Sequence, residues 1–282
     1  EKMIKLSIAI ADTNALPSAF VVFRGFESCI PKAAQLGFDG VELALKRASE
    51  IDIHLLERLL RDNNLEVSCI STGQVFADGG LTLTDENPRK RAQVIEIFKD
   101  LIDLAAQFGQ KINMGRVRGV IGDRSKEEVE NLFCETIIEL CHYAAHQNVT
   151  LLIEPINRYE SDFVNRVEEG VRLLKKTGMA NLKVMPDVFH MNIEEVSIAD
   201  ELSKYIRYID YVHLADSNRM APGQGHTDFR EIFTALARVG FKGWTSVEIL
   251  DKPSPDVAAQ QAAEFLLPLI KEYNEILAIT NT

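Results

Sequence analysis

The feature that most constrains this chain is a regular alternation of short β-branched segments with longer segments of helical period. The strands that we predict from it are Lys5–Ala11, Gly40–Leu45, Glu66–Thr72, Lys111–Gly115, Thr150–Ile156, Leu182–Val188, Asp210–Ala215 and Trp244–Leu250. Repeated strand–helix units favour a parallel sheet, and eight of them favour closure into a barrel. At 282 residues the chain also has the usual size of one such barrel. We therefore predict an α/β fold, a (β/α)8 TIM barrel, with residues 1–282 forming a single domain.

The helical segments carry recognisable start and stop signals. Residues 87–109 show one apolar stripe, and residues 127–148 follow a capping box formed by Ser125 and Glu128. Glycines fall where the helices should end, shortly before the next strand: Gly37, Gly109, Gly178 and Gly240. An open nucleotide-binding sheet would need a glycine-rich turn after the first strand, and residues 11–17 offer none. The barrel is the better interpretation.

Composition excludes several classes of function. The balance of 31 basic and 42 acidic side chains gives a net charge of −11, which would repel a phosphate backbone, so we expect no nucleic-acid partner. No apolar run is long enough to predict a membrane span. The four cysteines show no CxxC pair and are expected to be buried free thiols. We expect a cytoplasmic protein.

Four of the later strands end in a side chain that can bind a metal: Glu154, Asp187, His213 and Glu248. In a closed barrel the ends of strands five to eight are neighbours, so these groups can converge. A single strand-end carboxylate is more often a helix cap, but four unpaired polar groups at one barrel mouth would cost stability without a cation. Three carboxylates and an imidazole suit Mn2+, Mg2+ or Co2+, and zinc is an alternative. We predict one divalent ion, with Mn2+ favoured.

These residues resemble a known family, the xylose isomerase-like sugar isomerases and epimerases, and within it the D-tagatose 3-epimerase group. The matching segments are residues 154–160, 187–190, 213–219, 222–225 with 228–229, and 247–248, and the likeness extends over nearly the whole chain. The resemblance implies that Glu154, Asp187, His213 and Glu248 bind the metal. It also implies that Glu160, His190 and Arg219 contact the substrate, a small sugar or sugar phosphate. A homo-oligomer, dimer or tetramer, is expected from the resemblance alone.

The chemistry that fits such a site is proton transfer beside a carbonyl group. A metal that chelates a ketose would stabilise the enediolate formed when the neighbouring C–H loses its proton. Epimerisation needs a base on one face and an acid on the other, and Glu154 and Glu248 could flank the substrate. We favour a 3-epimerase. An aldose–ketose isomerase, an inosose dehydratase or isomerase, and a hydroxypyruvate isomerase would use a similar site. A sugar-binding barrel without activity is the alternative from another class.

The remaining candidates concern the substrate. Arg116 and Arg118 follow the fourth strand and could grip a phosphate or carboxylate, against the alternative of a solvated pair. Glu42, at the end of the second strand, could line the pocket or hold a loop. The connections at residues 72–87 and 215–228 are candidate lids on the catalytic face. His226 is left out of the metal set. A three-zinc endonuclease IV-like site is not expected, because residues 71–74 and 113–115 lack the required histidines.

Overall fold

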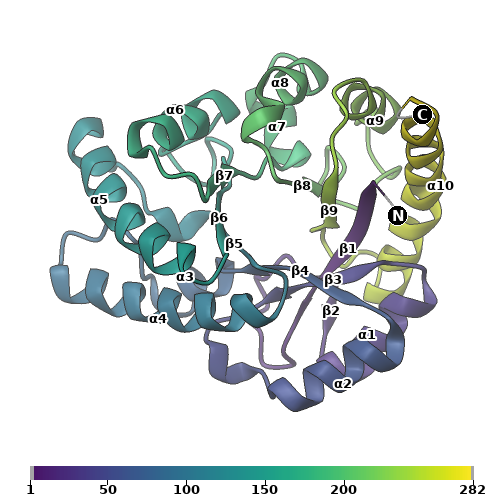
Figure 1. Ribbon diagram of the computed structural model, residues 1–282, viewed down its shortest axis with the longest axis horizontal. Helices are drawn as coiled ribbons and strands as arrows, with labels where there is room; N and C mark the ends of the chain where they lie inside the picture. Colours follow the sequence, from purple (N-terminus) through teal and green to yellow (C-terminus); the bar gives the residue numbers. More distant parts are fainter. Residues whose placement is uncertain (1–2, 281–282) are drawn as a thin grey trace.

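The computed structural model describes residues 3–280 and shows a ring of parallel strands enclosed by helices (Figure 1). The ring order is β7-β6-β5-β4-β3-β1-β9-β8, and β2 pairs with β1 outside it. Isolated bridges between Val184 and Ile209 and between Asp187 and His213 join β7 to β8. The strands are β1 (Ile4–Ala11), β2 (Phe23–Arg24), β3 (Gly40–Ala44), β4 (Glu66–Ser71), β5 (Lys111–Met114), β6 (Thr150–Ile153), β7 (Leu182–Val184), β8 (Tyr211–Leu214) and β9 (Gly243–Val247). The predicted (β/α)8 fold is confirmed.

Helices follow the strands and form the outer layer (Figure 1). They are α1 (Phe26–Gln35), α2 (Ile53–Asn63), α3 (Gly73–Gly79), α4 (Pro88–Gln107), α5 (Lys126–Ala145), α6 (Val167–Thr177), α7 (Val188–Glu194), α8 (Ile198–Tyr205), α9 (Phe229–Arg238) and α10 (Pro255–Thr280). Short 3-10 turns lie at η1 (Ala48–Glu50), η2 (Arg116–Arg118) and η3 (Ile206–Tyr208). No helix in residues 3–280 is long and apolar enough to cross a membrane.

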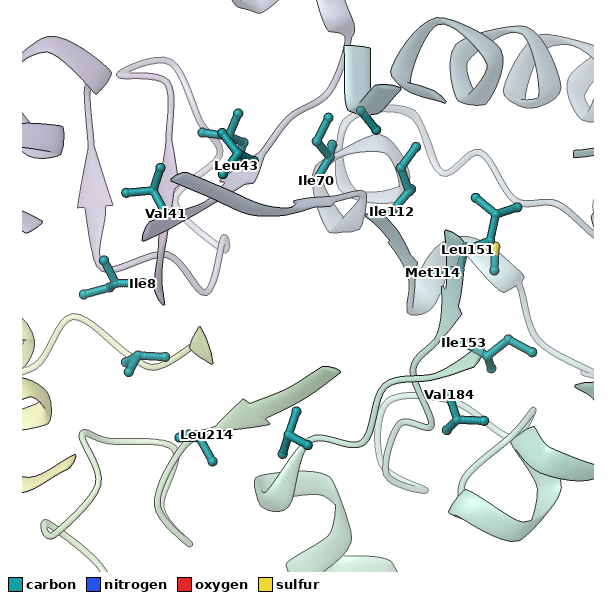
Figure 2. Close-up of a cluster of buried hydrophobic side chains, with 14 of the residues drawn as sticks. Ile8, Val41, Leu43, Ile70, Ile112, Met114, Leu151, Ile153, Val184 and Leu214 are labelled. Atoms are coloured by element: carbon teal, nitrogen blue, oxygen red, sulfur yellow. The ribbon is translucent and has the colours of Figure 1, made fainter. Parts of the chain in front are cut away.

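The side chains of the strands alternate between two environments. On β3, Val41 and Leu43 belong to the large apolar cluster shared with the helices, and similar side chains from the other strands join them (Figure 2). Glu42 lies between them in sequence and therefore points to the other side of the sheet, into the barrel. This period of two places one set of strand side chains against the helices and the other inside the barrel. The inner set includes Glu42 and a second apolar cluster with Cys69, Leu152 and Trp244.

The residues predicted to start and end helices do so in the structure. Ser125 accepts the backbone N–H of Glu128 at 3.1 Å and starts α5. Gly178 takes φ 67 directly after α6, a left-handed conformation that favours glycine at a helix end. Cys29, Cys69, Cys134 and Cys141 are buried free thiols, as predicted.

The strands end earlier than predicted near the site. β6 stops at Ile153 and β7 at Val184, so Glu154 and Asp187 lie just beyond the hydrogen-bonded ladder. Asp187 is the N-cap of α7 and accepts the N–H of Phe189 at 2.8 Å. The predicted lid at residues 72–87 contains the short helix α3, whereas residues 215–228 form an irregular loop around the buried carboxylate of Asp216.

Candidate metal centre and substrate pocket

Four side chains from consecutive positions around the ring converge at the carboxyl ends of the strands. Glu154, Asp187, His213 and Glu248 each present one ligand atom, and these atoms lie within 4.8 Å of one another. The Nδ1 atom of His213 lies 2.7 Å from Oε2 of Glu248 and 3.2 Å from Oε1 of Glu154. The barrel thus gathers residues that are up to 94 positions apart into one buried cluster, as the sequence predicted.

The cluster concentrates negative charge where water is scarce. Burial, followed by the charge of Glu248, raises the pKa of Glu154 to about 7. Burial also raises the pKa of Asp187 to about 6. Burial would lower the pKa of His213, but the carboxylates of Glu42, Glu248 and Glu154 raise it well above its ordinary value. The buried, crowded carboxylates therefore favour proton binding by Glu154, Asp187 and His213.

The arrangement fits a divalent cation. Oδ2 of Asp187 is buried and has no hydrogen-bond partner within residues 3–280. Oε2 of Glu248 is likewise buried without a well-aligned hydrogen bond, although it lies close to His213. Buried, unsatisfied carboxylate oxygens are costly unless a cation completes the site. Three oxygens and one imidazole nitrogen form a hard donor set suited to Mn2+, Mg2+ or Co2+.

A pocket opens above this cluster and is lined by both of the predicted acid–base residues. Its wall includes Glu154 and Glu248 together with Glu160, His190, Arg116 and Arg219. The lining also contains small apolar side chains, namely Ala9, Ala19, Val21, Ala44 and Ala77. A bound molecule would therefore meet both charged or polar groups and apolar surface.

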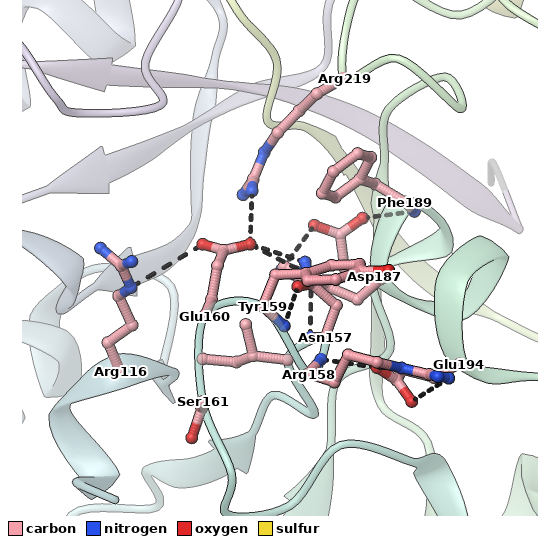
Figure 3. Close-up of polar contacts among 12 residues, drawn as sticks. Arg116, Asn157, Arg158, Tyr159, Glu160, Ser161, Asp187, Phe189, Glu194 and Arg219 are labelled. Carbon is pink, nitrogen blue, oxygen red and sulfur yellow. Dashed lines mark hydrogen bonds and ion pairs between the residues drawn. The ribbon is translucent and has the colours of Figure 1, made fainter.

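Glu160 links the two arginines of the pocket (Figure 3). Arg219 donates to Oε2 of Glu160 at 3.2 Å, and Nε of Arg116 lies 3.7 Å from Oε1. The guanidinium of Arg219 is sandwiched between Phe20 and Phe189, at 3.6 and 4.6 Å from their ring centres. This cation–π stack holds Arg219 rigidly at the edge of the site.

His190 lies between the metal cluster and the Glu160 group. Its Nδ1 atom accepts the backbone N–H of Asn157 at 3.2 Å, so its proton is on Nε2, which faces Oδ2 of Asp187 at 3.8 Å. Burial, followed by the charge of Arg219, lowers the pKa of His190 well below its ordinary value. The ring is therefore a neutral N–H donor between Asp187 and the pocket.

Two of the residues predicted to contact the substrate are not brought into the pocket. Arg118 is fully buried, and its guanidinium donates to the carbonyls of Met114, Gly115, Glu154, Phe163 and Val164. Glu42 lies beneath the cluster, inside the barrel, and bonds His213 and Tyr211. The sequence did not predict that Arg116 would line the pocket while Arg118 is buried. Both belong to the 3-10 turn η2, which directs side chains two positions apart to different sides.

Several pocket residues were not singled out from the sequence. Phe20 comes from the irregular segment after β1, Gln74 from α3, and Asn113 from β5. Asn157 was recognised only as part of a motif, yet its side chain touches both Glu160 and His190. Phe20 lies in a short apolar run with no motif to mark it, so only the tertiary structure revealed its stacking on Arg219.

The fold and the site together define a class: a (β/α)8 barrel with a buried site for a divalent cation at the carboxyl ends of its strands. The family model described as a xylose isomerase-like TIM barrel matches residues 30–269. This chain belongs to that family.

Named relatives support the same assignment. The D-psicose 3-epimerase of Enterocloster bolteae is 30% identical over 240 residues, covering 80% of this chain and 77% of the relative. The L-ribulose 3-epimerase of Methylomonas sp. is 29% identical over 223 residues, covering 78% and 76%. The crystal structure of a Methylomonas sp. D-allulose 3-epimerase in complex with D-allulose shares the fold, with a TM-score of 0.81, 23% identity and coverage of 95% and 98%. The relatives confirm the predicted enzyme class, an isomerase that acts on carbohydrates.

Proposed function

We propose that this protein is a divalent metal-dependent 3-epimerase of an uncharged ketose. The observation that carries the proposal is the placement of Glu154 and Glu248, which both line the pocket and both belong to the metal cluster. They leave the ring at β6 and β9, with β7 and β8 between them. A substrate seated over the cluster would therefore have one carboxylate on each side.

Inversion at a carbon requires a base on one face and an acid on the other. Glu154 and Glu248 provide two carboxyl groups for these roles, and we propose that each exchanges a proton with the substrate carbon. A bound divalent ion would polarise the carbonyl and a neighbouring hydroxyl, and so make the C–H more acidic. The chain's own contribution is to hold the two carboxyl groups rigidly on buried strand ends.

The remaining polar residues would orient the substrate. Arg219 and the neutral His190 supply N–H donors, and Glu160 supplies an acceptor, at one side of the pocket. These groups match the alternating donors and acceptors of sugar hydroxyls. The small apolar side chains of the lining would face the carbon skeleton.

The charge of the pocket favours a free ketose over a sugar phosphate. Arg219 already donates to Glu160, and Arg116 lies beside the same carboxylate. Arg118, which the sequence suggested together with Arg116 for an anionic group, is buried against backbone carbonyls. A phosphate would therefore have to compete with Glu160 for both arginines.

Three finer points remain predictions. Mn2+ is proposed as the resident ion because the donor set is hard and includes one imidazole. A homo-oligomer is proposed from the family, and location in the cytoplasm is proposed from the soluble-type composition. Metal analysis of purified protein, light scattering and fractionation of the producing cells would test these points.

The function is tested by NMR of metal-reconstituted protein in D2O with a panel of ketoses, ketose phosphates and inososes. We expect deuterium at one carbon with inversion, and about 10²-fold or greater loss of exchange in both Glu154→Gln and Glu248→Gln. Because both residues also belong to the metal cluster, each variant is measured at a metal concentration that saturates it. Glu57→Gln, on the outer helix α2, serves as the control and should exchange normally.

The other outcomes separate the alternatives. Transfer of the proton to the adjacent carbon would indicate an aldose–ketose isomerase, and loss of a hydroxyl would indicate a dehydratase. No exchange on any compound, with metal bound, would refute proton-transfer catalysis and favour a binding protein.

A further inference from the structure

The two ring nitrogens of His213 face different carboxylates. Nδ1 points into the metal cluster, where Glu248 and Glu154 lie at 2.7 and 3.2 Å. Nε2 points down into the barrel and lies 2.9 Å from both carboxylate oxygens of Glu42. Both His213 and Glu42 are fully buried, so no solvent competes for this contact. The side of the ring that faces away from the cluster is thus held as firmly as the side that faces it.

Glu42 itself is held from below by hydroxyl groups. The phenol of Tyr211 donates to Oε2 of Glu42 at 2.7 Å. The same phenol oxygen lies 2.7 Å from Oγ of Ser68, which in turn lies 2.7 Å from Oγ of Ser7. These residues come from β8, β3, β4 and β1, so the network crosses the interior of the barrel. A chain of buried hydrogen bonds of this kind fixes the position and direction of each member.

The network has the features of a supporting layer rather than of simple core packing. A buried carboxylate costs free energy unless donors satisfy it, and an apolar side chain at position 42 would avoid that cost. The donors here are Tyr211 and the ring of a metal-cluster residue. Glu42 is not among the residues that line the substrate pocket. Within residues 3–280, the contact that joins Glu42 to the candidate metal ligands is the one with His213.

We propose that Glu42, held by Tyr211, is a positioning residue for the metal centre: it keeps the proton of His213 on Nε2 and the Nδ1 lone pair aimed at the cation. A neutral imidazole has one N–H and one lone pair, and a carboxylate can only accept. With both oxygens of Glu42 at 2.9 Å from Nε2, the N–H of the ring is placed at Nε2, which leaves Nδ1 free to bind metal. The carboxylate also increases the electron donation of the ring to a bound ion.

This inference rests on the proposed metal centre, but its test needs no substrate. The direct measurement is 15N NMR of the histidine rings in wild-type protein loaded with Zn2+, a diamagnetic probe. For His213, assigned by comparison with His213→Gln, we expect a protonated Nε2 and a metal-bound Nδ1. A ring with the proton on Nδ1, or metal on Nε2, would overturn the proposal.

Variants provide a second, independent test by titration calorimetry with Mn2+. In Glu42→Gln the amide can act as donor or acceptor, so both tautomers of His213 become possible. We expect about 10- to 100-fold weaker Mn2+ binding, the usual effect of losing such a supporting carboxylate. Tyr211→Phe, which keeps the carboxylate but removes one of its donors, should weaken binding by about 2- to 10-fold. The matched control is Glu66→Gln, at the opposite end of the neighbouring strand β4, which should bind Mn2+ as the wild type does.

Unchanged Mn2+ affinity in folded Glu42→Gln would refute the positioning role. If that variant does not fold, unchanged affinity in Tyr211→Phe or the wrong tautomer in the wild type would do so. If the tautomer and the Mn2+ affinities are as expected but no sugar is turned over, the proposed epimerase activity alone would be refuted.

Discussion

Arg118 is expected to be a stability residue, and its replacement by Met gives a quantitative test of the site's architecture. The guanidinium donates to five backbone carbonyls from the ends of β5 and β6 and from the loop before α6. Met114, Gly115 and Val164 retain a second, backbone donor to their carbonyls. The carbonyl of Glu154 has no other donor within residues 3–280.

The expected loss of stability follows from which carbonyls keep another donor when Arg118 is replaced. Leaving the buried Glu154 carbonyl without a donor costs about 1–3 kcal/mol, and losing the other charge-assisted bonds adds to it. Burial of the charge, which lowers the pKa of Arg118 to about 10, offsets part of the loss because Met has no charge to desolvate. Val164 also takes φ 63, a strained conformation for a β-branched residue, and its carbonyl is held by Arg118. We expect Arg118→Met to lower the free energy of unfolding by about 3–5 kcal/mol.

The assay is urea denaturation of metal-free protein at pH 7, followed by circular dichroism. Arg116→Met is the matched control, because Arg116 belongs to the same 3-10 turn but is 44% exposed and faces the pocket. It should change stability by less than about 0.5 kcal/mol. A loss below about 1 kcal/mol in Arg118→Met, or an equal loss in both variants, would refute the reasoning.

Two further predictions concern pH and substrate binding. Burial and Glu248 raise the pKa of Glu154 to about 7, and neighbouring carboxylates outweigh burial to raise that of His213, so protons compete with the cation for these atoms. Mn2+ affinity should therefore be at least about tenfold lower at pH 6 than at pH 8 by calorimetry, and equal affinities would contradict this electrostatic account. Arg219→Lys loses the planar group that stacks between two rings while donating to Glu160. It should lower kcat/KM for the preferred ketose by about tenfold or more with the fold retained, and a change below twofold would argue against substrate contact.

The sequence was sufficient to predict the fold and to predict that Glu154, Asp187, His213 and Glu248 converge. Strand–helix alternation has only a few stable solutions, and eight units make the closed barrel the favoured one. The cluster residues could be identified because the fold places every strand end on one face, so a polar residue after each of four apolar runs implies convergence. Both inferences depend on the alternation of strand and helix patterns along the chain, which can be read directly from the sequence.

Tertiary structure decided the role of each side chain at the carboxyl ends of the strands. Arg116 and Arg118 are alike in sequence, but a 3-10 turn directs one to the pocket and the other to buried carbonyls. Glu42 lies on a buried strand, and nothing in its local sequence indicates a partner. Only the closed ring brings it beneath His213, 171 residues away. Such roles depend on distances between strands that are remote in sequence and on which partner satisfies each buried charge. Local sequence predicts neither these distances nor these partners, because both depend on the packing of the whole barrel.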